Sequence, residues 1–521
     1  MNLQNIKDAV RKLERYDPSV FGNPQNSFPQ FIHKIEIKEF RHIKQLEISF
    51  DHPITVLSGT NKIGKTSILI LIACSHYNFK RVDSTKYTST IRRHTWKDVL
   101  QFTNYENTSK DYEYKLYWRV GDDLRNGKSR RLRTSQSWSG VGKASNDPRR
   151  KNAQIRNKEV RFIDLDRIVP ARNVSKSLLR KISSSPQIRV NNDIEKAFCY
   201  IFSIPAEIEI FDIGSYVNKK AYLIKNNSES YSSYNAASGE ESVLNILHEI
   251  IDSPFNSLII IDEIEAGFHP YIQRKLANII SFISWKDKKQ FIITTHSPTL
   301  MSSFSQKSRK FIEPKMNGET RSINNISVNA AFSKMDSAAH PLLHLYCEDN
   351  IASFILKNLL VKLNSEYPYF DRLVNIIASG PANQVKNDYE RHKRNYDQMR
   401  LKIGYVCVFD GDYCTDEHYS HFHNNPQEYS MFLYPFTAPE KFLIASYLNQ
   451  FPNERLQTAL MISDHHTLFL EMVNEGLAAD EGQALNICWQ AFSNTAEYRA
   501  LKQKFNEFIL KAVKDFSVKN E

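Results

Sequence analysis

The sequence lacks the features that are typical of disulfide-bonded and membrane-spanning proteins. Its six cysteines are scattered and include no C-x-x-C pair, which favours reduced thiols over disulfides or a zinc site. No apolar run approaches the length of a membrane span. The segment MNLQNIKDAVRKLERYD carries charges from its start, unlike a signal peptide. We therefore expect a cytoplasmic protein with no membrane partner.

The composition is that of an ordinary globular chain with an excess of positive charge. Its 521 residues exceed what one hydrophobic core supports, so we expect two or three domains. The net charge of +11, from 69 basic and 58 acidic residues, favours a polyanionic partner. Between Arg119 and Arg161 there are 13 basic and 4 acidic residues, in a stretch rich in Ser, Asn and Gly. This pattern predicts a flexible basic insertion, either a solvated loop or a contact with nucleic acid or another partner.

The first half contains a phosphate-binding loop. FIHKIEIKEF and KQLEISF alternate like the two strands of a hairpin, and HPITVLSGTNKIGKTSILILIACS then predicts a strand, a loop and an apolar helix. The loop has the spacing Gly59-x-x-x-x-Gly64-Lys65-Thr66, in which backbone N–H groups surround a β-phosphate. Lys65 would contact the β- and γ-phosphate oxygens, and the Thr66 hydroxyl would bind Mg²⁺. The predicted nucleotide-binding residues of this loop are Gly59, Asn61, Gly64, Lys65, Thr66 and Ser67.

Two later strands end in residues suited to ATP hydrolysis. SLIIIDEIEAGFHP predicts a strand that ends at Asp262 and Glu263. Asp262 would hold the hydration shell of Mg²⁺, and Glu263 would polarise the attacking water. QFIITTHSP predicts another strand, which ends at His296, a residue placed to sense the γ-phosphate.

The segment ASGEESVLNILHEI lies ahead of both strands. It places Ser238, Gly239 and Glu240 at the start of an amphipathic helix. Taken alone, this turn is an ordinary helix cap. Because the segment precedes these two strands along the chain, it is instead typical of an anion site at a helix N-terminus.

The order of these four motifs resembles the ABC-type ATPase heads of the SMC, Rad50 and RecF kind. In that family the signature residues, here Ser238 and Gly239, complete the ATP site of the other subunit, so the resemblance implies at least a homodimer of heads. The chain has no long heptad run, so the coiled-coil arm of SMC and Rad50 is missing. Gln101 is a candidate for the family's Q-loop residue.

The second half repeats a strand–turn–helix pattern with acidic residues at the turns. Such repeats predict a parallel sheet whose ligands gather at the carboxyl ends of its strands. Glu348 follows the strand in HPLLHLYCEDN, and Asp410 and Asp412 follow the strand in IGYVCVFDGDY. Glu440, in APEKF, begins a later helix. Converging carboxylates are the ligands that Mg²⁺ or Mn²⁺ requires.

This arrangement resembles a Toprim domain, the metal-dependent unit of topoisomerases, primases and some nucleases. The resemblance implies that Glu348 is the acid/base or first metal ligand, that Asp410 and Asp412 bind magnesium, and that Glu440 binds a second ion. The chain departs from the family's first motif, because Asp349 follows Glu348 and position 352 is Ala.

Each of these pieces has another interpretation when it is taken alone. A D-x-D pair is common in solvated turns, and a glutamate beside a helix start can complement the helix dipole. A zinc site is an alternative for the cluster CTDEHYSHFH, although its spacing fits no standard zinc site; its candidate ligands are Cys414, His418, His421 and His423.

An ABC-type head followed by a Toprim domain resembles the OLD (overcoming lysogenisation defect) nucleases, which include Gabija and retron-associated effectors of anti-phage defence. The resemblance implies an α/β protein that is an ATP-regulated, Mg²⁺-dependent DNA endonuclease, held by a helicase or by a reverse transcriptase with its DNA–RNA product. The alternative functions are an ATP-switched nucleic-acid sensor or clamp whose Toprim unit binds without cutting, and a topoisomerase, for which no DNA-gate domain remains. The expected domains are an extension (1–30), the ATPase with its basic insertion (31–335), the Toprim unit (336–450) and a helical region (451–521).

Overall fold

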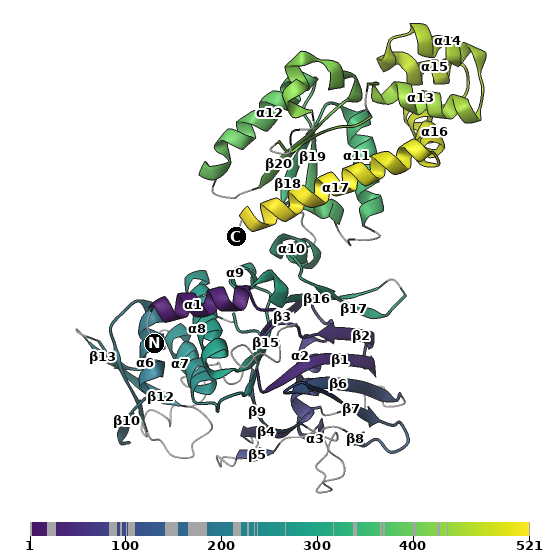
Figure 1. Cartoon of the computed structure of the whole chain (residues 1–521). Coiled ribbons are helices and arrows are strands. Elements are labelled where there is room, and N and C mark those ends of the chain that lie inside the picture. Colours follow the sequence, from purple (N-terminus) through teal and green to yellow (C-terminus); the bar gives the residue numbers. More distant parts are fainter. Residues whose placement is uncertain are drawn as a thin grey trace. The chain divides into compact units, whose positions relative to one another are not determined.

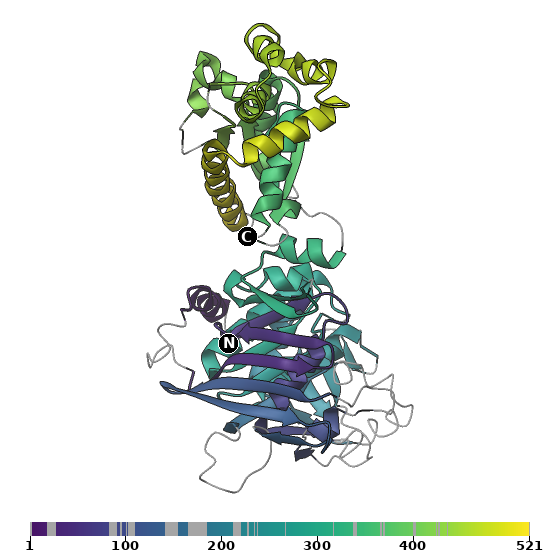
Figure 2. The same ribbon diagram turned by 90° about the vertical axis from the view of Figure 1, so that its right-hand side faces the viewer.

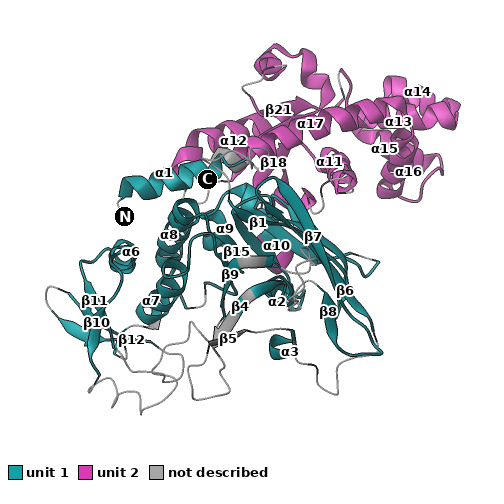
Figure 3. Cartoon of the chain, turned by 60° about the horizontal axis from the view of Figure 1, so that its bottom comes forward, with its two compact units in different colours: residues 1–331 teal, residues 332–521 magenta. Residues whose placement is uncertain are grey.

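The computed structural model divides the chain into two compact units, residues 1–331 and 332–521, which Figure 3 shows in teal and magenta. Each unit has its own sheet structure and its own core. The residues that the structure describes are 3–17, 28–82, 91–93, 96–100, 102, 110–140, 155–164, 185–211, 220–226, 229–233, 235–236, 238–265, 267–315, 317–336, 341–364, 367, 370–399, 403–423, 425, 428–434 and 436–519.

The described residues of unit 1 form three sheets with helices beside them. Its strands are β1 (Gln30–Phe40), β2 (Ile43–Ser49), β3 (Ile54–Gly59), β4 (His76–Val82), β5 (Ile91–Arg93), β6 (Tyr112–Val120), β7 (Asp123–Arg131), β8 (Trp138–Gly140), β9 (Ile155–Ile163), β10 (Gln187–Arg189), β11 (Glu207–Phe211), β12 (Ala221–Lys225), β13 (Ser230–Ser232), β14 (Leu258–Ile261), β15 (Gln290–Thr294), β16 (Arg309–Pro314) and β17 (Thr320–Asn324). Its helices are α1 (Leu3–Glu14), α2 (Lys65–Cys74), α3 (Trp96–Val99), α6 (Asn192–Phe202), α7 (Ser238–Ile251), α8 (Pro270–Asp287), α9 (Pro298–Ser302), the 3₁₀ turn η3 (Gln306–Ser308) and α10 (Val328–Asp336), which crosses the boundary between the units.

The largest sheet has eight strands in the order β17-β16-β3-β15-β14-β9-β4-β5 (Figure 1). The strands from β16 to β4 run parallel, and the edge strands β17 and β5 run antiparallel to their neighbours. Every residue of β3, β14 and β15 is buried, as expected for parallel strands covered on both faces. The carboxyl ends of these three strands therefore meet at one edge of the sheet.

A second, antiparallel sheet has the order β2-β1-β6-β7-β8 and faces the viewer in Figure 2, in purple and blue. Its inner side chains, such as Ile35 and Leu116, share one core with Ile68 and Ile72 of α2 and with Ile260 of β14. The helix that follows the phosphate-binding loop is thus held between two sheets, which fixes the position of the loop.

The sequence predicts a flexible insertion at residues 119–161. The parts of this range that the structure describes instead form strands. β6 and β7 form a tight hairpin that pairs Val120 with Asp123, and β8 continues the sheet. β9 lies inside the eight-stranded sheet, between β14 and β4. Its Lys158 is 1% exposed, and the amine donates hydrogen bonds to the Gln30 carbonyl and Asn256 Oδ1. Because these acceptors satisfy the amine, a basic residue is tolerated in a core strand.

The remaining parts of unit 1 are a small antiparallel sheet, β10-β11-β12-β13, and the N-terminal helix. Helix α1 packs against α8 and buries Ile6, Ala9 and Leu13. These apolar residues recur at a helical spacing, so one face of α1 joins the core of unit 1.

Unit 2 is built on a four-stranded parallel sheet in the order β19-β18-β20-β21. Its strands are β18 (Leu343–Cys347), β19 (Val374–Ala378), β20 (Gly404–Phe409) and β21 (Ser430–Phe432). Its helices are α11 (Asn350–Leu363), α12 (Ala382–Asn395), α13 (Pro439–Gln450), α14 (Glu454–Ile462), α15 (Leu468–Asn474), α16 (Glu481–Ser493) and α17 (Ala496–Lys519), with 3₁₀ turns η4 (Phe370–Leu373), η5 (Tyr396–Gln398), η6 (Gly411–Thr415), η7 (Glu417–Phe422) and η8 (His465–Thr467).

The long helix α17 packs against β20. Phe516 lies with its ring centroid 5.0 Å from that of Tyr405. A Cβ on Gly404 would lie 2.5 Å from Phe516 Cγ, so this close approach requires glycine. The C-terminal helix therefore belongs to the core of unit 2. No helix among the described residues of the chain is both long and apolar enough to cross a bilayer.

Candidate functional site

The loop between β3 and α2 has the backbone of a phosphate-binding loop. Gly64 has a φ of 95°, and a Cβ at this position would lie 2.7 Å from Ile43 Cδ1. A Cβ on Gly59 would lie 2.5 Å from the carbonyl oxygen of Ile312. The positive φ therefore favours glycine at position 64, and the close backbone contact requires it at position 59. The Lys65 amine donates hydrogen bonds to the carbonyls of Gly59 (3.0 Å) and Thr60 (3.3 Å), which places this cation inside the loop.

The predicted Mg²⁺ ligands Thr66 and Asp262 lie together. Thr66 Oγ1 donates a hydrogen bond of 2.7 Å to Asp262 Oδ2. The other carboxylate oxygen of Asp262 accepts from the hydroxyl of Thr294, whose Oγ1 in turn accepts from the Glu263 backbone N–H at 2.9 Å. Thr294 thus holds both acidic residues at the end of β14. Glu263 has a φ of 52°, a conformation uncommon for a residue with a side chain and often found at functional sites.

His296 and Lys65 lie among the same carboxylates. Burial lowers the pKa of Lys65, while the charges of Glu263, Asp262 and Glu265 act to raise it. Burial and the nearby Lys65 charge lower the pKa of His296, so its imidazole is neutral at pH 7. The His296 backbone N–H donates to Glu265 Oε1.

Two residues of this site, Glu265 and Thr294, were missed by the motif analysis. Glu265 lies two positions after Glu263, and Thr294 precedes the THS motif. Both positions are visible in the sequence, but their roles depend on the pairing of β14 with β15.

The predicted signature residues begin α7. Glu240 accepts a hydrogen bond of 3.1 Å from the Tyr231 hydroxyl, and a Cβ on Gly239 would lie 3.9 Å from Phe268 Cδ1. The first turn of α7 therefore contacts β13 and the segment ahead of α8. Ser238 is the first residue of α7, and the candidate Gln101 lies outside the described residues.

In unit 2, two of the predicted acidic residues meet at the ends of neighbouring strands. Glu348 follows β18, Asp410 follows β20, and these strands pair in parallel. The Asp410 backbone N–H donates a hydrogen bond of 2.9 Å to Glu348 Oε1. Glu348 is 9% exposed. Burial raises the pKa of Glu348, and the charges of Asp412 and Asp349 raise it further.

Asp410 is surrounded by like charges. Burial is the largest cause that raises the pKa of its carboxyl group. The charges of Glu348, Asp349, Glu440 and Asp412 raise this pKa further. Its Oδ1 is buried and receives no hydrogen bond from the described residues. A buried carboxylate oxygen without a donor is costly unless a cation or a proton satisfies it. These residues therefore fit a divalent cation, whose charge would offset their repulsion.

Asp412 lies on the turn η6 and is exposed. A Cβ on the intervening Gly411 would lie 1.4 Å from the carbonyl oxygen of Tyr434, so only glycine fits between the two aspartates. Among the described residues, the carboxylates of Glu348, Asp410 and Asp412 do not gather within 4.8 Å of one another. Asp412 is the exposed member of these three carboxylates.

The two remaining acidic residues of this region differ in role. Asp349 caps α11, since its Oδ1 accepts from the backbone N–H groups of Ile351 (2.9 Å) and Ala352 (2.8 Å). Glu440 is 2% exposed, and burial raises the pKa of its carboxyl group.

Among the described residues, the cysteine and histidines of CTDEHYSHFH form no metal-ligating group, so the alternative zinc site is not formed there.

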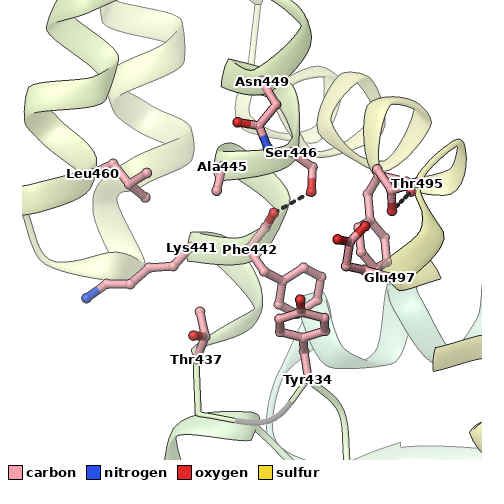
Figure 4. Close-up of a pocket in the computed structure, with 11 residues that line it drawn as sticks. Tyr434, Thr437, Lys441, Phe442, Ala445, Ser446, Asn449, Leu460, Thr495 and Glu497 are labelled. Carbon is pink, nitrogen blue, oxygen red and sulfur yellow. Dashed lines mark hydrogen bonds between the residues drawn. The ribbon is translucent and has the colours of Figure 1, made fainter. Parts of the chain in front are cut away.

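A cavity of about 330 Å³ lies beside α13, the helix that carries Glu440 (Figure 4). Its lining includes Tyr434, Lys441, Phe442 and Thr495. The predicted acidic residues do not line this cavity, so it is a neighbour of the carboxylate site and not part of it.

The comparisons with known proteins bear on unit 1. A family model described as "AAA domain, putative AbiEii toxin, Type IV TA system" matches residues 54–302, which include β3, the phosphate-binding loop, Asp262 and His296. The chain contains an AAA-type ATPase domain. This domain binds a nucleotide, and its geometry supports ATP hydrolysis with Mg²⁺.

Solved structures similar to the chain include three SMC heads, each matched over 56% of this chain. The SMC head domain from Thermotoga maritima is 13% identical, with a TM-score of 0.35 and 98% of its own length covered. The SMC head bound to the C-winged helix domain of ScpA is 15% identical, with a TM-score of 0.39 and 97% covered. The Smc head with an extended coiled coil, bound to the C-terminal domain of ScpA derived from Pyrococcus furiosus, is 12% identical, with a TM-score of 0.34 and 96% covered.

The raised pKa values in unit 2 predict a pH-dependent stability of the metal-free protein. A carboxyl group with a raised pKa binds more protons in the folded than in the unfolded chain, so the free energy of unfolding falls as pH rises above the ordinary carboxyl range. In EDTA we expect the melting temperature to fall by a few degrees between about pH 5 and pH 8. Saturating Mg²⁺ should remove most of this fall.

Thermal unfolding of the variant Asp410→Asn/Asp412→Asn provides the control. Its melting temperature in EDTA should depend less on pH than that of the wild type, and Mg²⁺ should change it little. If the melting temperatures of both proteins depended equally on pH, or if Mg²⁺ stabilised both equally, the carboxylate cluster would not be the cause of the pH dependence.

Proposed function

We propose that the chain is an ATP-regulated, Mg²⁺-dependent DNA endonuclease of the OLD type, in which unit 2 is a Toprim nuclease domain. The observation that carries this proposal is the meeting of Glu348 and Asp410 at neighbouring strand ends, with a buried Asp410 oxygen that no described residue satisfies. The parallel order of β19-β18-β20-β21 supports it, because ligands of such sheets bind at the carboxyl ends of the strands.

The residues of unit 2 have separate tasks in this proposal. Asp410 and Asp412 would hold the divalent ion, Mg²⁺ or Mn²⁺, with Glu440 available to a second ion. When bound, such an ion supplies charge stabilisation to the attacking and leaving oxygens of a phosphodiester. Glu348, whose pKa is raised by burial, can hold or accept a proton near pH 7 and is the candidate acid/base.

The test of this proposal is cleavage of supercoiled plasmid DNA by the purified wild type. With Mg²⁺, nicked or linear DNA should accumulate, and EDTA should stop the reaction. DNA binding without any nicking, in Mg²⁺ and in Mn²⁺, would reject the nuclease and favour the second candidate function.

That second candidate is an ATP-switched sensor or clamp whose unit 2 binds nucleic acid without cutting it. Two observations favour it. The Asp349 carboxylate is engaged as the cap of α11, and position 352, where Toprim nucleases often carry an acid, is Ala. Both reduce the number of carboxylates that are available to a second ion.

In this proposal the ATPase acts across a homodimer, because the resemblance to ABC-type heads implies that Ser238 contacts the nucleotide of the other subunit. Lys65→Ala and Ser238→Arg should each be inactive alone. An equal mixture should regain about a quarter of the wild-type ATPase rate, because half of the dimers then contain one intact site of two. No recovery from a mixture that has exchanged subunits, or a monomer with full ATPase activity, would contradict the composite site.

In the cell, the proposed role is anti-phage defence. The candidate partners are DNA and either a reverse transcriptase with its DNA–RNA product or a helicase. The net charge of +11 supports a nucleic-acid partner. The neighbouring genes would show which of the two protein partners accompanies this chain. A plaque assay tests the role in defence, because deletion of the gene should remove protection against phage.

A further inference from the structure

Glu440 lies beside two histidines that the motif analysis did not single out. His465 and His466 form the turn η8, between α14 and α15. One ligand atom from each of Glu440, His465 and His466 lies within 4.8 Å of the others. His466 Nδ1 is 3.4 Å from Glu440 Oε1, and the two imidazole centroids are 4.0 Å apart. Among the described residues, no other group of three His, Cys, Asp or Glu side chains converges in this way.

We propose that Glu440, His465 and His466 bind a transition-metal ion of the Zn²⁺ class, separate from the Mg²⁺ proposed at Asp410 and in place of a second oxygen-bound ion at Glu440. Imidazole nitrogens favour Zn²⁺ over Mg²⁺, which binds oxygen ligands. Two histidines and one glutamate are three of the four ligands of a tetrahedral zinc site, and water can supply the fourth.

The geometry of the three residues fits an ion after a small rearrangement. Ligand atoms of a tetrahedral zinc site lie about 3.4 Å apart, given bonds of about 2.1 Å. Glu440 is 2% exposed and fixed at the start of α13, whereas the side chains of His465 and His466 are 31% and 68% exposed. The histidines are therefore the side chains that rotate toward the glutamate.

The turn that carries the histidines is itself held in place. The Asp464 carboxylate accepts a hydrogen bond of 3.1 Å from the His466 backbone N–H and lies 3.5 Å from His465 Nδ1. A carboxylate partner of this kind commonly orients a metal-ligating histidine. Burial and the Asp349 charge raise the pKa of Glu440, whereas a hydrogen bond that its carboxylate accepts from its own backbone N–H and the two imidazoles lower it.

A simple ion pair between Glu440 and His466 is the competing explanation, and it makes no use of His465. The metal site requires both histidines. The variant His465→Ala therefore distinguishes the two explanations, because it leaves the ion pair intact and removes a metal ligand.

The experiment is titration of the full-length protein with Zn²⁺ by calorimetry, in excess Mg²⁺ and without DNA. The wild type should bind one Zn²⁺ per chain that Mg²⁺ does not displace. His465→Ala and His466→Ala should each weaken binding at least tenfold, and His423→Ala, which alters another exposed histidine of unit 2, should leave it unchanged. Zn²⁺ should raise the melting temperature of the wild type and of His423→Ala only.

Co²⁺ provides a second readout, since visible absorption bands of tetrahedral Co²⁺ should appear with the wild type and vanish with His465→Ala. Zn²⁺ binding that His465→Ala does not weaken, or no binding to the wild type, would overturn the inference. Because this assay uses no DNA, its outcome is independent of whether unit 2 cleaves DNA.

Discussion

Replacing Lys65 by alanine should lower the ATP turnover of the chain by two to three orders of magnitude, because the γ-phosphate loses its closest cation in the transition state. The Lys65 amine is held by two loop carbonyls and lies among the charges of Asp262, Glu263 and Glu265. No other cation of the phosphate-binding loop is buried in this way among its described residues. A steady-state phosphate-release assay measures the effect.

Glu263→Gln tests the base assigned to the same site. This variant should still bind ATP but hydrolyse it at least about a hundredfold more slowly, because the amide cannot polarise the attacking water. Glu265→Gln is the matched control: its side chain accepts from the His296 backbone, so we expect a smaller loss of rate. An ATPase rate of Glu263→Gln equal to that of the wild type would remove Glu263 from the mechanism.

Asp410→Ala and Asp412→Ala should each abolish DNA cleavage while ATP turnover is retained. The two aspartates lie in unit 2, and the nucleotide-binding residues lie in unit 1. Asn at either position should fail as well, because an amide keeps the shape of the side chain but lacks the charge that holds a hard cation. Product formation on agarose gels and phosphate release measure the two activities separately.

The control for this prediction is Asp397→Ala, an exposed aspartate of unit 2 on η5. It should cut plasmid DNA at the wild-type rate. Equal losses of cleavage in Asp397→Ala and Asp410→Ala would indicate a general effect of charge removal and not a metal site.

Much of the nucleotide site could be predicted because its residues follow apolar strands in order along the chain. The strand-ending positions of Gly59, Asp262 and His296 depend only on local pattern, and the parallel pairing of β3, β15 and β14 then brings them together. The same reasoning placed Glu348 and Asp410 at neighbouring strand ends. Alternation and apolar runs indicate where strands end, and parallel sheets place those ends at one edge.

The parts that the sequence did not reveal depend on long-range contacts. The basic residues of β9 made this strand look like a solvated loop in the sequence. Lys158 is in fact buried, and burial lowers the pKa of its amine to about 7. Its hydrogen-bond acceptors, Gln30 and Asn256, are remote in sequence. The pairing of Glu440 with His466 likewise joins two elements that no local pattern connects.

The proposed nuclease site of unit 2 is chemically separate from the ATPase site of unit 1. The most direct test is one reaction that contains supercoiled plasmid, ATP and Mg²⁺, with DNA products and released phosphate measured together. For Asp410→Asn/Asp412→Asn we predict wild-type phosphate release and no nicked or linear DNA, beside a wild-type reaction that gives both. Undiminished plasmid cleavage by the double variant would contradict the nuclease site assigned to these residues.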